Sequence, residues 1–95
     1  RIMGKNGKGP GEFDFPYDLD IDAQGNLYIA EFANHRIQKL SPEGKPLGVW
    51  GSLGSKAGQL CEPWGVSICG DSLFIADTQN HRIQAPRLSQ MKSFQ

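Results

Sequence analysis

The pentapeptide Asn-His-Arg-Ile-Gln occurs twice in the chain, at Asn34–Gln38 and again at Asn80–Gln84. Each copy ends a longer stretch in which glycines, a proline and apolar residues recur in the same order. The equivalent pairs are Gly4 and Gly51, Gly7 and Gly54, Gly11 and Gly58, Pro16 and Pro63, Ile21 and Ile68, and Leu27 and Leu73. The chain therefore contains two copies of one unit, and a period of roughly 20–50 residues indicates a solenoid, a propeller or a similar array.

Each copy has the pattern of short strands joined by tight turns. Tyr17–Asp22 alternates apolar and acidic residues, which predicts a half-buried strand. The turn at Ala23–Asn26 leads into the apolar strand Leu27–Glu31. Further strands are predicted at His35–Leu40, Pro46–Trp50, Trp64–Cys69, Leu73–Asp77 and His81–Ala85. A repeated four-stranded antiparallel meander without helical periodicity predicts the all-β class and the blades of a propeller.

A longer pattern runs from Gly11 to Gln38: Gly-x-Phe-x-x-Pro-x-x-Leu-x-Ile-Asp-x-x-Gly-x-Leu-Tyr-Ile-Ala-Glu-x-x-Asn-His-Arg-Ile-Gln. This pattern resembles the NHL repeat, and the resemblance covers residues 2–84. It implies a β-propeller, commonly of six blades, to which this chain contributes two four-stranded blades. The second copy departs from the pattern at Leu60 and Cys69, which replace a phenylalanine and an acid.

The repeats also predict how the chain is organised. Repeat 1 is expected at about 5–51 and repeat 2 at about 52–84, followed by a non-repeat tail at 85–95. Residues 1–4 match the end of a fourth strand, so they are expected to be the outer strand of a preceding blade. His81–Ala85 is then an open edge that needs a partner. Either the chain is part of a longer propeller, or three copies close a ring as a homo-trimer by exchanging the strand at Ile2–Gly4.

The charge balance argues against some classes of partner. Ten basic and ten acidic residues give no net charge, so nothing favours the neutralisation of nucleic-acid phosphates. Lys5 and Lys8 form a mild basic cluster, and RNA binding stays an alternative because the resemblance implies it for some propellers. No apolar run approaches the ~18 residues of a membrane span, so no membrane partner is expected.

Catalysis has no clear sequence support. The two histidines, His35 and His81, lack the third ligand of a catalytic zinc site, and no nucleophile motif is present. Asp18, Asp20 and Asp22 share a strand face but lack the glycine and glutamate of a calcium loop. The sequence predicts no catalytic residue, metal or cofactor. A metal-binding enzyme remains the alternative, because the resemblance implies a family that includes amidating lyases with a central metal.

One set of repeated polar residues is predicted to support the fold. An acid and an arginine flank the turn between the second and third strands, and they can form a charge-assisted pair. An asparagine between them can bind the backbone of the turn. The set comprises Glu31, Asn34 and Arg36 in the first copy and Asp77, Asn80 and Arg82 in the second.

Residues that differ between the copies are better candidates for function. In a propeller, the connections that enter the first strand and those between the second and third strands lie on one face. That face is predicted to hold Lys5, Lys8, Phe15, Tyr17, Phe32, Glu62, Trp64, Thr78 and Gln79. Exposed aromatic and charged residues together are typical of a recognition surface. The sequence therefore predicts a non-catalytic scaffold for protein or peptide partners, although the equivalent Tyr17 and Trp64 can instead pack one blade on the next.

Overall fold

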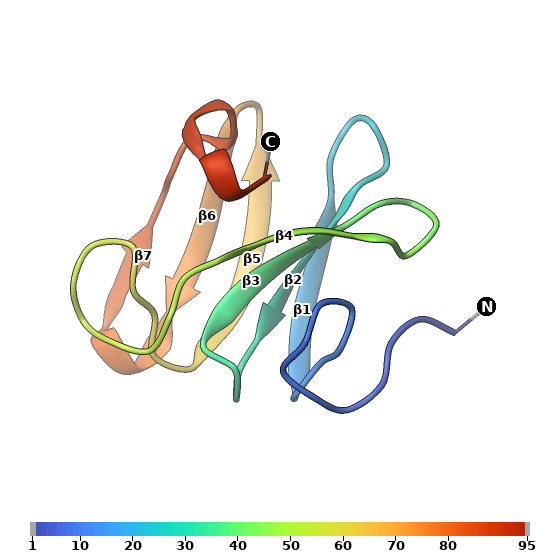
Figure 1. The fold of residues 1–95 in the computed structure, drawn as a ribbon. Coiled ribbons are helices and arrows are strands. Elements are labelled where there is room, and N and C mark those ends of the chain that lie inside the picture. Colours follow the sequence, from blue (N-terminus) through green and yellow to red (C-terminus); the bar gives the residue numbers. More distant parts are fainter. Residues whose placement is uncertain (1, 95) are drawn as a thin grey trace.

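A computed structural model describes residues 2–94 and contains two antiparallel sheets (Figure 1). The first sheet has the order β1 (Pro16–Ile21), β2 (Leu27–Glu31), β3 (Arg36–Leu40) and β4 (Pro46–Trp50). The second sheet has the order β5 (Pro63–Cys69), β6 (Ser72–Asp77) and β7 (Arg82–Gln84). The all-β prediction is confirmed. Each strand begins and ends within one residue of its predicted bounds.

The hairpin turns carry the residues that such turns require. Between β1 and β2, the Asp22 carboxylate accepts hydrogen bonds from the backbone N–H groups of Gln24 and Asn26, each at 2.9 Å. Gly25 follows with φ of 86°, a left-handed conformation that suits glycine. The hydroxyl of Tyr28 also donates to Asp22, at 2.9 Å. The turn is therefore fixed by one carboxylate that serves as its local acceptor.

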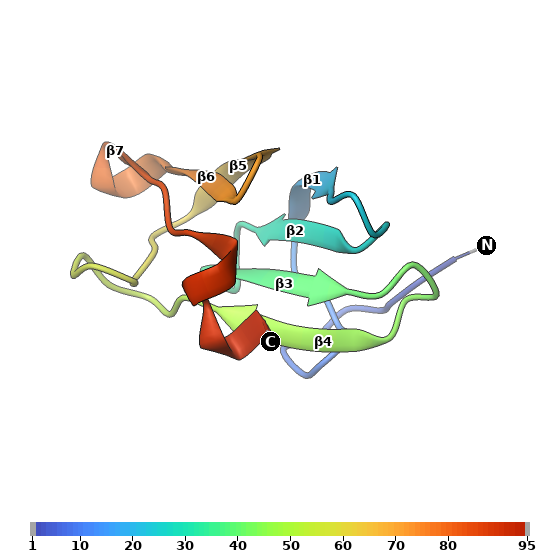
Figure 2. The same cartoon turned by 90° about the horizontal axis from the view of Figure 1, so that it is seen from above.

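The two sheets meet along their first strands, β1 and β5. Seen from above, they lie closest there and diverge toward β4 and β7 (Figure 2). The Oδ2 atoms of Asp18 and Asp20 accept hydrogen bonds from the backbone N–H groups of Val66 and Ile68, at 3.0 and 2.7 Å. Two of the alternating acids of β1 therefore cover the exposed edge of the neighbouring strand.

The C-terminal segment fills the space between the diverging sheets. It forms the short 3₁₀ helices η2 (Leu88–Gln90) and η3 (Lys92–Phe94), and its end lies beside β4 (Figure 2). The Phe94 ring meets Tyr28 of β2 with centroids 5.6 Å apart. The core cluster joins both sheets and this segment, and it comprises Tyr28, Ala30, Ile37, Leu60, Val66, Leu73, Ile75, Met91 and Phe94. The non-repeat tail is thus part of the core.

Apolar side chains also remain uncovered on the outer side of each sheet. Leu19 and Ile21 of β1 are about half exposed, and Leu19 lines a cavity of about 460 Å³. Phe74 and Ile83 are exposed on the second sheet. Ile2–Gly4, expected as an outer strand, forms no strand in the described chain. Each sheet therefore has a face on which further structure can pack.

The limits of the described chain affect two expectations. The residues at positions 1 and 95, which were expected in the outer strand and the tail, lie outside it. Within residues 2–94, no helix is long and apolar enough to cross a membrane.

Candidate binding surface

Four aromatic side chains gather where β1 and β5 begin. The ring of Tyr17 lies at the centre and stacks on Phe32 with centroids 4.9 Å apart. Trp64 meets Tyr17 edge-on at 5.5 Å, and Phe15 meets it edge-on at 6.4 Å. Stacked and edge-to-face contacts are the geometries that aromatic rings prefer. We call Phe15, Tyr17, Phe32 and Trp64 the aromatic cluster.

The aromatic cluster is open to solvent. Phe15 is 61% exposed, Tyr17 49% and Trp64 54%, while Phe32 is partly buried. The structure thus brings together the four aromatic residues that the sequence analysis placed on one face. Tyr17 and Trp64 do touch across the two sheets, yet half of each side chain remains accessible. This contact therefore leaves a surface that a ligand can reach.

The aromatic cluster is specific to this junction. In the second repeat, the residues equivalent to Phe15 and Phe32 are Glu62 and Thr78. Phe15 and Glu62 share a left-handed backbone, with φ of 51° at both. That conformation is rare for bulky residues and costs about 1–2 kcal/mol. The backbone geometry therefore belongs to the repeat, whereas the phenylalanine ring does not.

The repeated histidines occupy turn positions. His35 and His81 have φ of 52° and 54°, the left-handed conformation that ends each turn before the third strand. Nδ1 of His35 accepts a hydrogen bond from the backbone N–H of Glu62 at 3.0 Å. His35 therefore ties the turn of the first sheet to the loop that leads into β5, beside the aromatic cluster.

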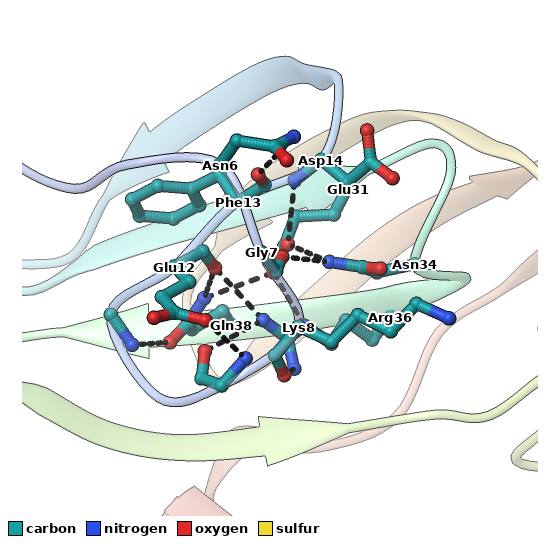
Figure 3. Close-up of polar contacts among 12 residues, drawn as sticks. Asn6, Gly7, Lys8, Glu12, Phe13, Asp14, Glu31, Asn34, Arg36 and Gln38 are labelled. Carbon is teal, nitrogen blue, oxygen red and sulfur yellow. Dashed lines mark hydrogen bonds and ion pairs between the residues drawn. The ribbon is translucent and has the colours of Figure 1, made fainter.

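A buried polar network holds the glycine-rich loop 7–12 against the first sheet (Figure 3). Nε of Arg36 donates to Oε2 of Glu31 at 2.7 Å, and both side chains are almost fully buried. Nδ2 of Asn34 donates to Oε1 of Glu31 and to the carbonyl of Gly7, each at 2.9 Å. The other guanidinium nitrogens of Arg36 donate to the carbonyls of Lys8, Gly9 and Glu12. The predicted turn residues thus lie together and fix the loop.

Gln38 completes the network, although its position in the sequence predicted no role for it. Its Nε2 donates to Oε2 of Glu31 at 3.0 Å and to the carbonyl of Glu12 at 3.1 Å. Its Oε1 accepts from the backbone N–H of Gly11 at 2.7 Å. The signal was present in the sequence, because this glutamine ends the repeated pentapeptide.

The second repeat builds the same network on loop 54–59. Oδ2 of Asp77 accepts from Nε of Arg82 at 2.7 Å, from Asn80 at 3.0 Å and from Gln84 at 3.2 Å. Its Oδ1 accepts from the backbone N–H of Cys61 at 2.8 Å. Burial acts to raise the pKa of Asp77, but these hydrogen bonds outweigh it and hold the pKa below its usual value. Loops 7–12 and 54–59, which precede the first strand of each repeat, are therefore each held in place by a hydrogen-bond network.

Of the two candidate lysines, Lys8 lies on loop 7–12 and Lys5 lies two residues before it. Nζ of Lys5 is 3.6 Å from Oε2 of Glu12, and the lysine side chain is 78% exposed. Such an exposed ion pair contributes little stability. Lys8 is exposed and offers its backbone carbonyl to Arg36. Within residues 2–94, the structure describes no contact between either ammonium group and the aromatic cluster.

The described residues do not assemble a metal site. Across residues 2–94, no three His, Cys, Asp or Glu side chains lie close enough to hold an ion. Cys61 and Cys69 are free thiols. The acids Asp18 and Asp20 instead accept backbone hydrogen bonds from β5, as described above.

Residues 13–40 and 60–85 match the family model described as the NHL repeat, which together is more than half of the chain. The chain belongs to the NHL repeat family. Each matched stretch contains three strands, β1–β3 or β5–β7, and the side chains that form one network, while the loop that the network holds precedes the stretch. The resemblance drawn from the sequence is therefore confirmed for both repeats of this NHL protein.

Of three curated relatives of this NHL chain, only one is named as an enzyme. NHL repeat-containing protein 3 of Homo sapiens is 34% identical over 58 residues, which is 60% of this chain and 17% of that protein. Protein brain tumor of Drosophila melanogaster is 31% identical over 85 residues, or 86% of this chain and 8% of that protein. Peptidyl-alpha-hydroxyglycine alpha-amidating lyase 2 of the same organism is 36% identical over 78 residues, which is 77% of this chain and 19% of that protein. The chain spans less than a fifth of the length of each.

Proposed function

We propose that this chain is a non-catalytic binding module, and that it binds a protein or peptide partner through the aromatic cluster. The observation that carries the proposal is the cluster itself, with three of its four rings about half exposed or more. Aromatic side chains supply much of the energy at protein interfaces, because they bury large areas with few rotatable bonds. Fold alone does not assign a function, so the proposal rests on this surface.

The support beneath the cluster strengthens this proposal. Phe15 lies three residues after loop 7–12, which Glu31, Arg36 and Gln38 hold through buried hydrogen bonds. Phe32 is fixed by a backbone hydrogen bond from its N–H to the carbonyl of Phe15, at 2.9 Å. A surface that is already ordered loses less entropy when a partner binds. The rings are therefore presented on a preorganised platform.

A random peptide library displayed on phage tests this function. The immobilised chain is expected to select peptides whose binding is lost when Phe15 is changed to serine. Phe74→Ser is the matched control, because Phe74 is also an exposed phenylalanine but lies on β6 outside the aromatic cluster. If no selected peptide distinguishes Phe15→Ser from Phe74→Ser, the proposed binding surface is wrong.

Single-stranded RNA is the second candidate ligand, because bases stack on exposed aromatic rings. The absence of net charge disfavours it, since RNA binding depends on phosphate neutralisation. Titration with a uridine oligonucleotide at two salt concentrations separates the two ligands. Salt-sensitive binding that disappears in the Lys5→Glu, Lys8→Glu double variant would replace the peptide proposal.

We also propose that the uncovered sheet faces allow the chain to associate with copies of itself. Leu19 and Ile21 on one side, and Phe74 and Ile83 on the other, offer apolar surface at opposite ends of the pair of sheets. A trimer would complete a six-bladed ring from this two-blade unit. Light scattering on a sizing column measures the mass directly, and a monomer at all concentrations would contradict self-association.

A further inference from the structure

We propose that the aromatic cluster recognises the cationic side chain of an arginine in a partner protein. This inference rests on the proposed function, because it assigns a ligand class to the same surface. A cation over the face of an aromatic ring is attracted by the ring's electron density. Arginine is the better match of the two basic residues, because its planar guanidinium also stacks on rings.

The arrangement of the rings is suited to a planar cation. Tyr17 is contacted by all three of the other aromatic side chains, from 4.9 to 6.4 Å between centroids. Phe15 and Trp64 meet Tyr17 edge-on, so the rings do not form a single stack. Rings in several orientations present both faces and edges to solvent. Such a surface can contact a guanidinium plane and the methylene stem of its side chain together.

Two acidic residues neighbour members of the cluster along the chain. Asp14 immediately precedes Phe15, and Glu62 lies two residues before Trp64. Both are partly exposed, and within the described chain neither carboxylate has a hydrogen bond or an ion pair. The carboxylates of Glu31 and Asp77 are instead neutralised by the network arginines. The uncompensated charge at the cluster therefore favours a cation and opposes a phosphate.

Backbone contacts order the main chain at both acids. The carbonyl of Asp14 accepts from the N–H of Ala33, the residue after Phe32, at 3.3 Å. The N–H of Glu62 donates to Nδ1 of His35 at 3.0 Å. The main chain that carries both acids is therefore ordered, and exposed aromatic rings with neighbouring acids are complementary to arginine.

A matched pair of short peptides tests this proposal. The probes are acetyl-Gly-Ala-Arg-Ala-Gly-amide and the same peptide with citrulline, which keeps the shape of arginine but not its charge. Binding is followed by the indole N–H signals of the two tryptophans in NMR spectra. Trp64 lies in the cluster, whereas Trp50 packs against the core and serves as the internal control. The arginine peptide is expected to shift the Trp64 signal and to bind about five- to tenfold more tightly than the citrulline peptide.

Variants of the acids add a second readout. The Asp14→Asn, Glu62→Gln double variant is expected to weaken the arginine peptide about two- to fivefold and to leave the citrulline peptide unchanged. Its unfolding midpoint in urea shows that the fold is intact. Equal binding of both peptides would overturn the arginine inference. Library peptides that depend on Phe15 but lack arginine would also overturn it, while the binding surface itself would stand.

Discussion

The carboxylate of Asp18 joins the two sheets through the backbone of Val66. Its Oδ2 accepts the N–H of Val66 at 3.0 Å, and its Oδ1 accepts the N–H of Leu19 in its own strand at 3.0 Å. Asp20 repeats the arrangement with Ile68 and Ile21. In the second repeat, Gly65 and Ser67 occupy these positions, and neither has a carboxylate. The first strand of repeat 1 therefore has carboxylates that accept hydrogen bonds from a neighbouring sheet, and the first strand of repeat 2 has none at the equivalent positions.

Replacing Asp18 by alanine should destabilise the chain by about 1–3 kcal/mol, because two backbone donors lose a charged acceptor. Asp18→Asn keeps one acceptor oxygen and should cost less. Urea unfolding measures both. Equal stability of the alanine variant and the unmodified chain would show that solvent satisfies these groups equally well.

The two network arginines should differ in importance. Arg36→Ala leaves the Glu31 carboxylate buried without its cation, so a loss of roughly 3–5 kcal/mol is expected. Arg82→Ala should cost less, since the side chain of Arg82 is 31% exposed and that of Arg36 only 10%. Water can therefore replace part of the contacts of Arg82. Urea unfolding of the two variants side by side tests this order, and a greater cost for Arg82→Ala would contradict it.

Acid should weaken the second repeat through Asp77. Its pKa in the folded chain lies below the usual value, so its contribution to stability is complete above about pH 4 and is lost as the pH falls through the folded pKa. Asp77→Asn removes this dependence. The difference in urea midpoint between Asp77→Asn and the unmodified chain should therefore be smaller at pH 3 than at pH 7. A constant difference at both pH values would exclude the carboxylate as the source.

The strands and the turns could be predicted from the sequence because both are local. Alternation identified β1, and a proline and a glycine identified the turn before β4. The network was predicted only in part, because Gln38 forms hydrogen bonds with Glu12 and Gly11, which precede it by 26 and 27 positions in the chain. Such contacts follow from how the loop packs on the sheet, and spacing alone does not reveal them.

The roles of Asp18 and of the tail could not be predicted for the same reason. The acids of β1 follow the alternation of a half-exposed strand, and only the approach of β5 gives them backbone partners. Met91 and Phe94 lie outside the repeat and have no periodic pattern. Their burial depends on the angle between the two sheets, which is a property of the packed molecule.

Phe15 should contribute to binding while its strained backbone lowers stability. Phe15→Asn removes the ring but suits the left-handed backbone, since asparagine adopts positive φ readily. The gain should offset most of the lost aromatic contact, so stability should change by less than about 1 kcal/mol. Phe15→Ala loses the same ring without that gain and should be the less stable variant. Both should lose peptide binding equally, and a difference in binding would mean that the loop conformation, rather than the ring, is recognised.

The C-terminal segment should detach from β4 when a side chain is added at Gly48. Gly48 has no side chain, and a Cβ atom at this position would overlap the carbonyl oxygen of Ser93 and touch the ring of Phe94. Gly48→Ala should therefore displace η3, breaking the hydrogen bond from Nζ of Lys39 to the Phe94 carbonyl at 3.0 Å and uncovering Tyr28.

Hydrogen exchange measures this release directly. The amide of Phe94, which donates to the carbonyl of Met91 at 2.9 Å, should lose its protection in Gly48→Ala. Phe94→Ala provides the comparison, because it removes a ring that is only 3% exposed without disturbing β4. Phe94→Ala should destabilise the chain by roughly 3–5 kcal/mol. Gly48→Ala should cost a similar amount if the whole C-terminal segment leaves β4. Retained protection at Phe94 in Gly48→Ala would mean that β4 moves instead of the tail.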